Sequence, residues 1–179
     1  MDDGVFVPHA PALVSVVGIV FRGGYWMDGV LHTEILVDGF DATQKIAEMV
    51  MASPHYRQIR VIMLNGITFA GFNVVDIKEL SARTGLPVIA VTSKKPNLAE
   101  VQAALKHLPD SQKRWEAVLN AGELFSVSTN KGKWRIFVEA MGLSKSLAVE
   151  ILRLTSTRSK IPEPLRVAHI VASGISDAL

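Results

Sequence analysis

The sequence contains no cysteine, which excludes disulfides, thiolate nucleophiles and the cysteine ligands of structural zinc. It also lacks any run of eighteen apolar residues, so no membrane-spanning helix is predicted. Hydrophobic residues make up 49% and charged residues 20% of the 179 positions, which is typical of a globular protein rather than a disordered chain. Together these features favour a single domain over residues 1–179 and a cytoplasmic location.

Charge of either sign is sparse overall, and the net charge is only +2, but it is distributed unevenly. Residues 1–92 contain six Lys or Arg against nine Asp or Glu, whereas residues 93–179 contain thirteen against eight. An acidic half that holds cations beside a basic half that contacts polyanions would give this distribution. Ordinary variation of surface charge would give it too.

Hydrophobic periodicity predicts a β-hairpin followed by alternating helices and strands. Residues 14–21 and 27–37 have the β-branched content and alternation of two strands joined by a Gly-containing turn. Further strands are expected at 58–64, 87–93, 123–128 and 133–139, and helices at 41–53, 74–83, 97–107, 110–121, 144–155 and 164–178. Antiparallel strands followed by parallel crossover units indicate an α/β fold with one mixed sheet and helices on both faces.

The segment "VIMLNGITFAGFNVVDIKEL", residues 61–80, places two glycines and two asparagines between a predicted strand and a predicted helix. Gly66 and Gly71 have the spacing of a phosphate-binding P-loop, but Phe72 and Asn73 follow where that motif needs Lys and then Ser or Thr. This excludes a nucleoside-triphosphatase loop. Two interpretations remain: a ligand-binding turn at the carboxyl end of a strand, or a purely structural turn. We expect Phe69 and Phe72 to pack beneath the loop.

Two segments resemble the endonuclease V superfamily: "VIMLNGITFAGFNVVDIKELSARTGLPVIAVTSK", residues 61–94, and "KIPEPLRVAHI", residues 160–170. A wider pattern, including "VVGIVFRGGYWMDGVL", is similar to an uncharacterised, largely archaeal family of the same ribonuclease H-like group. This second resemblance covers nearly the whole chain. It implies a ribonuclease H-like sheet, and the resemblance to endonuclease V implies cleavage of phosphodiester bonds in DNA or RNA with Mg²⁺ or Mn²⁺.

The resemblance implies a metal and catalytic site assembled from four separated positions: Asp2 or Asp3, Asp38 or Asp41, Asn65, and His169. Endonuclease V has an aspartate where this chain has Asn65, and an amide oxygen coordinates Mg²⁺ without adding charge, so metal binding should be weaker. The imidazole of His169 would bind metal or move a proton to the leaving oxygen. Each acid also has a structural interpretation, as a solvated terminal residue, a turn residue or a helix cap.

Seven residues are candidates for contact with nucleic acid: Gly66, Gly71, Lys94, Lys95, Lys131, Lys133 and Arg166. The lysines follow a predicted strand or accompany Trp134 in a predicted hairpin, and basic residues beside an aromatic are common on nucleic-acid-binding surfaces. An exposed hairpin without function is the alternative. Two functions therefore remain: a metal-dependent nuclease, which His169 favours, or a nucleic-acid-binding module with weak or no catalysis, which Asn65 favours. The sequence leaves the oligomeric state open.

Overall fold

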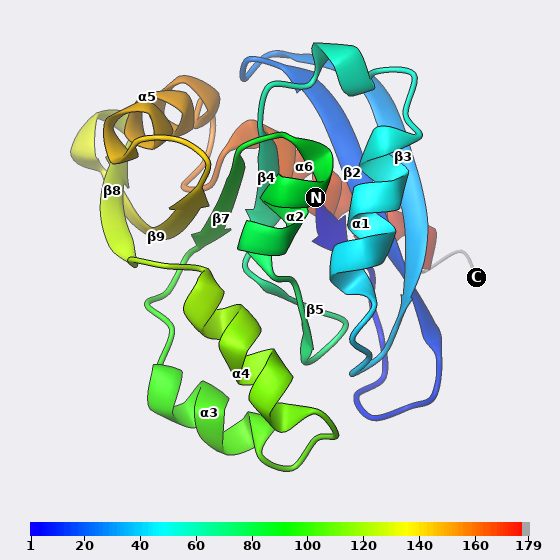
Figure 1. Cartoon of the computed structure of the whole chain (residues 1–179). Coiled ribbons are helices and arrows are strands. Elements are labelled where there is room, and N and C mark those ends of the chain that lie inside the picture. Colours follow the sequence, from blue (N-terminus) through cyan, green and yellow to red (C-terminus); the bar gives the residue numbers. More distant parts are fainter. Residues whose placement is uncertain (177–179) are drawn as a thin grey trace.

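The computed structural model describes residues 1–176 and has the expected mixed α/β fold (Figure 1). The strands are β1 (Asp2–Asp3), β2 (Leu13–Arg22), β3 (Trp26–Leu36), β4 (Ile62–Asn65), β5 (Thr68–Phe69), β6 (Asn73–Val74), β7 (Val88–Thr92), β8 (Phe125–Thr129) and β9 (Trp134–Met141). The helices are α1 (Ala42–Met51), α2 (Ile77–Thr84), α3 (Leu98–Leu105), α4 (Ser111–Asn120), α5 (Lys145–Thr155) and α6 (Glu163–Ser176), with short 3₁₀ turns η1 (Tyr56–Gln58) and η2 (Asn130–Gly132).

Strands β1, β2 and β3 form one antiparallel group, and β4, β7, β9 and β8 form a second in that order. The main chain of Met1 joins them: its nitrogen donates to the Met63 carbonyl over 2.7 Å, and its carbonyl accepts from Asn65 over 3.1 Å. The strand order across both groups is therefore β3-β2-β1-β4-β7-β9-β8. Strands β4 and β7 are paired in parallel, and a helical crossover connects them.

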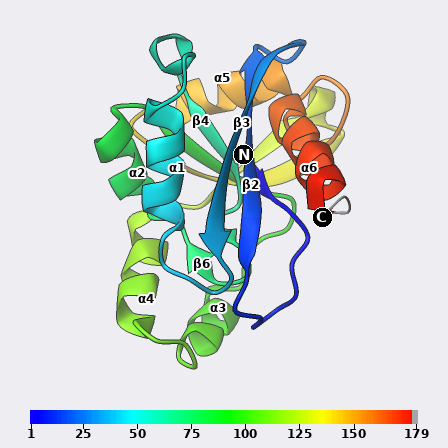
Figure 2. The same ribbon diagram turned by 90° about the vertical axis from the view of Figure 1, so that its right-hand side faces the viewer.

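Helices cover both faces of this sheet (Figures 1 and 2). On one face α1 and α2 bury Ile46, Val50 and Leu80 against apolar residues of β2, β3, β4 and β7. On the other face α5 packs with Leu152, and α6 with Leu165, against β7, β8 and β9. Fully burying a residue of this size contributes about 1.5–3 kcal/mol, so the two layers provide most of the driving force for the fold.

Helices α3 and α4 stand outside the sheet as a helical hairpin between β7 and β8 (Figure 1). Part of their contact with the rest of the molecule is a small apolar cluster in which Leu105, Ala117 and Val118 pack on Val74 of β6, with Phe72 at its edge. This cluster brings α4 beside the glycine-rich loop, and Phe72 packs as the sequence predicted.

The predicted elements recur with small shifts, and two differences have identifiable causes. The strand expected at 58–64 starts only at Ile62, because Tyr56–Gln58 form a 3₁₀ turn held by a 2.6 Å hydrogen bond from the Tyr56 hydroxyl to the Thr84 carbonyl. The loop after β4 contains a miniature antiparallel pair, β5 and β6, which is too short for a periodicity to reveal. Within residues 1–176, no helix is both long and apolar enough to cross a membrane.

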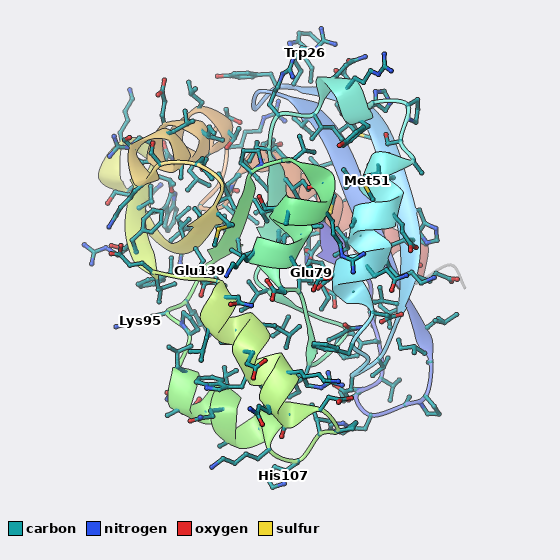
Figure 3. The ribbon with its side chains drawn as sticks, viewed as in Figure 1. Trp26, Met51, Glu79, Lys95, His107 and Glu139 are labelled. Carbon is teal, nitrogen blue, oxygen red and sulfur yellow. The ribbon has the colours of Figure 1, made fainter. Side chains whose placement is uncertain are left out.

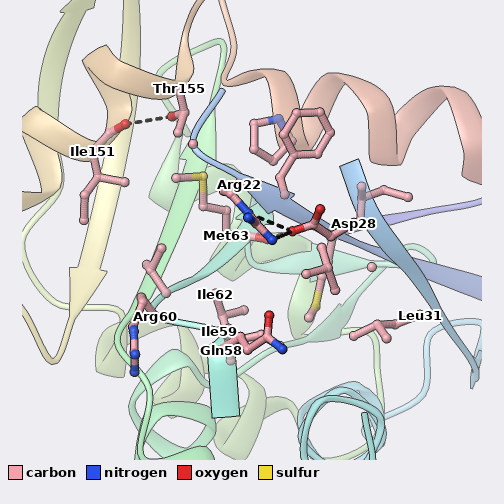
Figure 4. Close-up of a pocket in the computed structure, with 18 of the residues that line it drawn as sticks. Arg22, Asp28, Leu31, Gln58, Ile59, Arg60, Ile62, Met63, Ile151 and Thr155 are labelled. Carbon is pink, nitrogen blue, oxygen red and sulfur yellow. Dashed lines mark hydrogen bonds and ion pairs between the residues drawn. The ribbon is translucent and has the colours of Figure 1, made fainter. Parts of the chain in front are cut away.

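An apolar groove opens beside Met1, because β1 has two residues while both of its neighbours continue further. Its volume is about 380 Å³, and its walls are formed mainly by residues 18–23 of the β2 end and residues 58–63 at the start of β4. Helix α5 contributes Ile151, Leu154 and Thr155 to the wall. Figure 4 shows the ion pair that Arg22 forms with Asp28 at 2.9 Å inside this lining.

Candidate functional site

Asp2, Asn65 and His169 meet at the centre of the sheet. Pairing of β1 with β2 fixes Asp2 opposite Val17, and its side chain is only 4% exposed. Its Oδ2 accepts a hydrogen bond from Asn65 Nδ2 over 2.9 Å and lies 2.9 Å from His169 Nδ1. Three segments that are distant in sequence thus converge on one carboxylate oxygen, and Asp2 is not a solvated terminal acid.

Asp3 lies next to this cluster and is supported by the glycine-rich loop. Its Oδ2 accepts a 2.6 Å hydrogen bond from the main-chain nitrogen of Ala70. Burial raises the pKa of Asp3 to about 6, the hydrogen bond from Ala70 opposes that rise, and the negative charge of Asp2 adds to it. Two adjacent carboxylates that are partly shielded from solvent concentrate negative charge, and a bound cation would neutralise it.

The two glycines of the loop have left-handed backbone conformations that other residues adopt at a cost. Gly66 has φ +80° and Gly71 has φ +88°. A Cβ atom on Gly71 would collide with Oδ1 of Asp38. Phe69 is 1% exposed and packs beneath the loop, as predicted. Gly71 therefore allows the main chain to approach the carboxylate of Asp38 more closely than a residue with a side chain could.

Asp38 lies on the other side of Ala70 from Asp3. The Asp38 nitrogen donates to the Ala70 carbonyl over 2.9 Å, and Asp38 Oδ1 accepts a 2.9 Å hydrogen bond from the nitrogen of Phe72. Asp38 Oδ2 lies 2.9 Å from Nδ1 of the exposed His9. Asp38, His9 and Ala70 all have positive φ angles, of 50°, 61° and 42°. Backbone strain of this kind gathers at functional sites.

Asp41 is engaged in a different network. It occupies the N-cap position of α1, but its Oδ1 accepts from Asn73 Nδ2 over 2.6 Å and from the nitrogen of Leu36 over 3.3 Å. The capping hydrogen bond to the helix comes instead from Asn73 Oδ1, which accepts from the Ala42 nitrogen over 3.0 Å. These contacts tie Asp41 to the end of β3 and to Asn73, and no hydrogen bond in residues 1–176 joins it to Asp2.

The basic candidates lie on the surface in two groups. Lys94 and Lys95 are exposed immediately after β7, and Figure 3 shows Lys95 at the outer edge of the molecule. Lys131 and Lys133 are exposed in the β8–β9 connection, and Lys133 Nζ stands 5.0 Å from the centre of the Trp134 ring.

Arg166 is a special case among the basic candidates. Its guanidinium forms two hydrogen bonds with the buried carboxylate of Glu163, at 2.9 and 2.5 Å. That double hydrogen bond lowers the pKa of Glu163. Arg166 therefore fixes the start of α6, the helix that carries His169.

Sequence patterns missed Arg114, which is 2% exposed on α4. Its guanidinium donates to the main-chain carbonyls of Asp38, Gly39 and Phe72 at 2.6–2.8 Å. One arginine on an amphipathic helix normally predicts a solvated side chain, so no local signal could have found this role. His9 was missed as well, because its partner Asp38 is 29 residues away.

The polar side chains around Asp2 have the chemistry that suits a hard divalent cation. Asp2 and Asp3 supply carboxylate oxygens and Asn65 an amide oxygen, the donors that Mg²⁺ and Mn²⁺ prefer, and His169 adds an imidazole nitrogen. Within residues 1–176, however, no three His, Asp or Glu side chains lie close enough together to hold a metal ion by themselves.

Comparisons with known proteins show relatives that match nearly the whole chain. The chain is 50% identical over 177 residues to a UPF0215 protein of Methanothermobacter thermautotrophicus, covering 98% of this chain and 85% of the relative. A solved protein of unknown function from Archaeoglobus fulgidus is 37% identical, with TM-score 0.86, over 97% of this chain and 94% of the other.

The fold extends to more distant proteins. Endonuclease V of Ciona intestinalis, solved with DNA that contains inosine, matches with TM-score 0.59 at 16% identity, over 93% of this chain and 80% of the other. The family model described as Endonuclease dU matches residues 1–176. The chain therefore belongs to the Endonuclease dU family, an archaeal family with the ribonuclease H-like fold of endonuclease V.

Proposed function

We propose that this protein is an endonuclease that hydrolyses phosphodiester bonds of nucleic acid with the help of Mg²⁺ or Mn²⁺. The observation that carries the proposal is the convergence of Asn65 Nδ2 and His169 Nδ1 on Oδ2 of Asp2, each at 2.9 Å. Membership of the Endonuclease dU family supports it. In this reaction water forms a bond to phosphorus while one ester P–O bond breaks, and the leaving oxygen takes up a proton.

Asp2, Asp3 and Asn65 are the residues that would hold the metal. A divalent cation at such carboxylates lowers the pKa of water and neutralises the charge that develops on phosphorus. Asp3 suits this role, because burial and the nearby charge of Asp2 disfavour its ionised form, which a bound cation would stabilise. The amide of Asn65 donates to Asp2 and thereby holds that carboxylate in one orientation.

His169 is the candidate proton-transfer group. Its Nδ1 lies beside Asp2, while its side chain remains 60% exposed at the protein surface. A carboxylate at one ring nitrogen fixes the tautomer and the ring orientation, so that the second nitrogen can exchange a proton with a bound substrate. The ion pair between Glu163 and Arg166, on the same helix, sets the direction from which the ring approaches.

Nucleic acid is the proposed partner, and the cytoplasm is the proposed location. The exposed Lys94 and Lys95 follow β7, which is the sheet neighbour of the strand that ends at Asn65. Lys131 and Lys133 would bind phosphates further along the same nucleic-acid strand. Because the family description names dU, DNA that contains deoxyuridine is the first substrate to test.

The decisive test is cleavage of labelled duplex and single-stranded DNA that contains one deoxyuridine, one inosine or only the four standard bases. The full-length protein is incubated with Mn²⁺, Mg²⁺ or EDTA, and products are separated on a denaturing gel. We expect metal-dependent cleavage of the deoxyuridine strand, lost in Asp2→Asn. A folded protein that leaves every substrate intact in both metals contradicts the proposal.

Asn65 favours a second candidate, a binding module that kept the fold but cleaves weakly or not at all. An amide at the third ligand position brings one negative charge less than a carboxylate. This alternative predicts tight DNA binding in EDTA that neither metal changes, without products. The same experiment separates the two functions.

A further inference from the structure

We infer that Arg114 is a positioning residue, which acts through Asp38 to fix the carboxylates around the loop of residues 70–72. This inference rests on the proposed function, because it concerns the same site. Arg114 lies on α4, a helix of the external hairpin rather than of the sheet. Nothing else about that hairpin explains why a charged side chain should be buried to 2% exposure.

The guanidinium of Arg114 connects three separate segments. Nε donates to the Pro109 carbonyl at 2.9 Å, Nη1 to Gly39 at 2.6 Å and to Phe72 at 2.7 Å, and Nη2 to Asp38 at 2.8 Å. No carboxylate forms an ion pair with it among residues 1–176. A buried cation whose partners are carbonyl groups is a clamp on the main chain.

The clamp acts on the two loops that carry or contact the carboxylates. Asp38 and Gly39 lie between β3 and α1, and Phe72 lies in the glycine-rich loop. With Arg114 bound to both, the nitrogen of Phe72 reaches Asp38 Oδ1 at 2.9 Å. The ring of Phe40 covers the guanidinium at 5.4 Å and excludes water from one side.

A short path leads from the clamp to Asp3. Asp38 donates from its nitrogen to the Ala70 carbonyl at 2.9 Å, and Ala70 donates from its nitrogen to Asp3 Oδ2 at 2.6 Å. The carbonyl of Ala70 thus bonds the main chain of Asp38, and the nitrogen of Ala70 bonds the side chain of Asp3. If the loops separate, Asp38 and Asp3 lose the common support that sets their spacing.

A planar guanidinium is needed because four donors must point at four carbonyl oxygens at once. A lysine ammonium is a compact point charge on a flexible stem and cannot reproduce this fork. Arg114→Lys keeps the charge and most of the volume but loses the geometry. It is therefore the main test variant, and Arg114→Gln is the second.

The experiment is a double-mutant cycle of Arg114→Lys and Asp38→Asn on the full chain. Two quantities are measured, the apparent Mn²⁺ affinity and the single-turnover rate on deoxyuridine DNA, and thermal melting reports the folded fraction. We expect each single variant to lower the rate at least 10-fold, and the double variant to match Asp38→Asn alone. Non-additivity of this kind identifies a residue that works through its neighbour.

Arg83→Gln on α2 is the matched control, because Arg83 is exposed and pairs only with Glu79. It should leave both quantities within 2-fold of the wild type. Suppose that the wild type is active. If Arg114→Lys then leaves both quantities unchanged, or if the losses of the two single variants simply add in the double variant, the inference is wrong while the proposed function stands. A folded wild type that neither binds Mn²⁺ nor cleaves overturns the proposed function, and the inference with it.

Hydrogen exchange tests the clamp directly, even if Arg114→Lys lowers the melting temperature. At a temperature where Arg114→Gln and Arg114→Lys are both folded, the amides of Asp38 and Phe72 should exchange at least 10-fold faster than in the wild type. The amides of β7 serve as the internal reference and should not change. Equal protection at all of these amides contradicts the clamp.

Discussion

His169 Nδ1 lies 2.9 Å from Asp2 Oδ2, although 167 residues separate the two in sequence. The contact joins the last described helix to the shortest strand of the sheet. Asp2 is buried while the imidazole is largely exposed, so the carboxylate orients a ring that remains free to meet a substrate. The contact is the most direct geometric sign of a reactive site in this fold.

Replacing His169 by alanine should reduce cleavage without reducing DNA binding. Removing a positioned proton-transfer group costs about 100-fold or more in rate, whereas phosphate contacts elsewhere are kept. The measurement pairs single-turnover cleavage with a binding titration in EDTA. His107→Ala, on the exposed α3–α4 turn, is the control and should behave like the wild type. A cleavage loss below 3-fold for His169→Ala would contradict the assigned role.

Replacing Asn65 by aspartate should strengthen metal binding and weaken the metal-free protein. The change removes the hydrogen bond that Asn65 donates to Asp2 and adds a third negative charge, which should cost about 1–3 kcal/mol of unfolding free energy without metal. Saturating Mn²⁺ should then raise the melting temperature of the variant more than that of the wild type. Asn97→Asp, at the cap of α3, keeps its acceptor and is the control. Equal Mn²⁺-induced shifts would show that Asn65 is not a ligand.

Replacing Gly71 by alanine should destabilise the protein more than the same change at Gly85. Both glycines have positive φ, and that conformation alone costs a Cβ-bearing residue about 1 kcal/mol. At Gly71 the new methyl group also collides with Asp38 Oδ1, whereas nothing lies within 4 Å of the position at Gly85. Urea unfolding of both variants measures the difference. Equal losses would mean that the loop relaxes away from Asp38 without cost.

Glu139 should make stability depend on pH. It is 7% exposed on β9, and burial raises its pKa above the ordinary 4.5. The native state therefore binds a proton more readily than the unfolded state, so this residue contributes a loss of stability as pH rises from about 4.5 through its native pKa. Glu139→Gln should remove that loss and stabilise the protein at pH 8 by about 1 kcal/mol.

The check for Glu139 is urea unfolding at pH 8 and at pH 5. The gain from Glu139→Gln should shrink at the lower pH, because protonation already relieves the wild type there. Glu150→Gln, an exposed change on α5, should show no such dependence. A gain that is equal at both pH values would assign the effect to packing rather than to charge.

Local sequence patterns predicted most of the elements, because each one carries its own periodicity. The hairpin expected at 14–21 and 27–37 is found at Leu13–Arg22 and Trp26–Leu36. Both loop glycines have the left-handed conformation that justified singling them out. The helix expected at 74–83 begins only at Ile77, because the side chain of Asp76 accepts hydrogen bonds from the nitrogens of Lys78 and Glu79 and caps it there.

The features that the sequence patterns could not predict depend on contacts between residues that are distant in sequence. Carbonyl groups of three segments surround the buried Arg114, at Pro109, at Asp38 and Gly39, and at Phe72, and no spacing along α4 encodes that. Asp41 looked like a helix cap, but Asn73, 31 residues beyond Ala42, supplies the capping oxygen. Asp2 looked poorly held, and only its pairing with β2 and its contact with His169 explain its burial.

The groove beside Met1 has a practical consequence for anyone who purifies the protein. Strand β1 runs antiparallel to β2, so residues placed directly ahead of Met1 are directed along Gly18 to Arg22, between that strand and β4. An affinity tag fused at this end would press its linker into an apolar slot that adjoins Asp2.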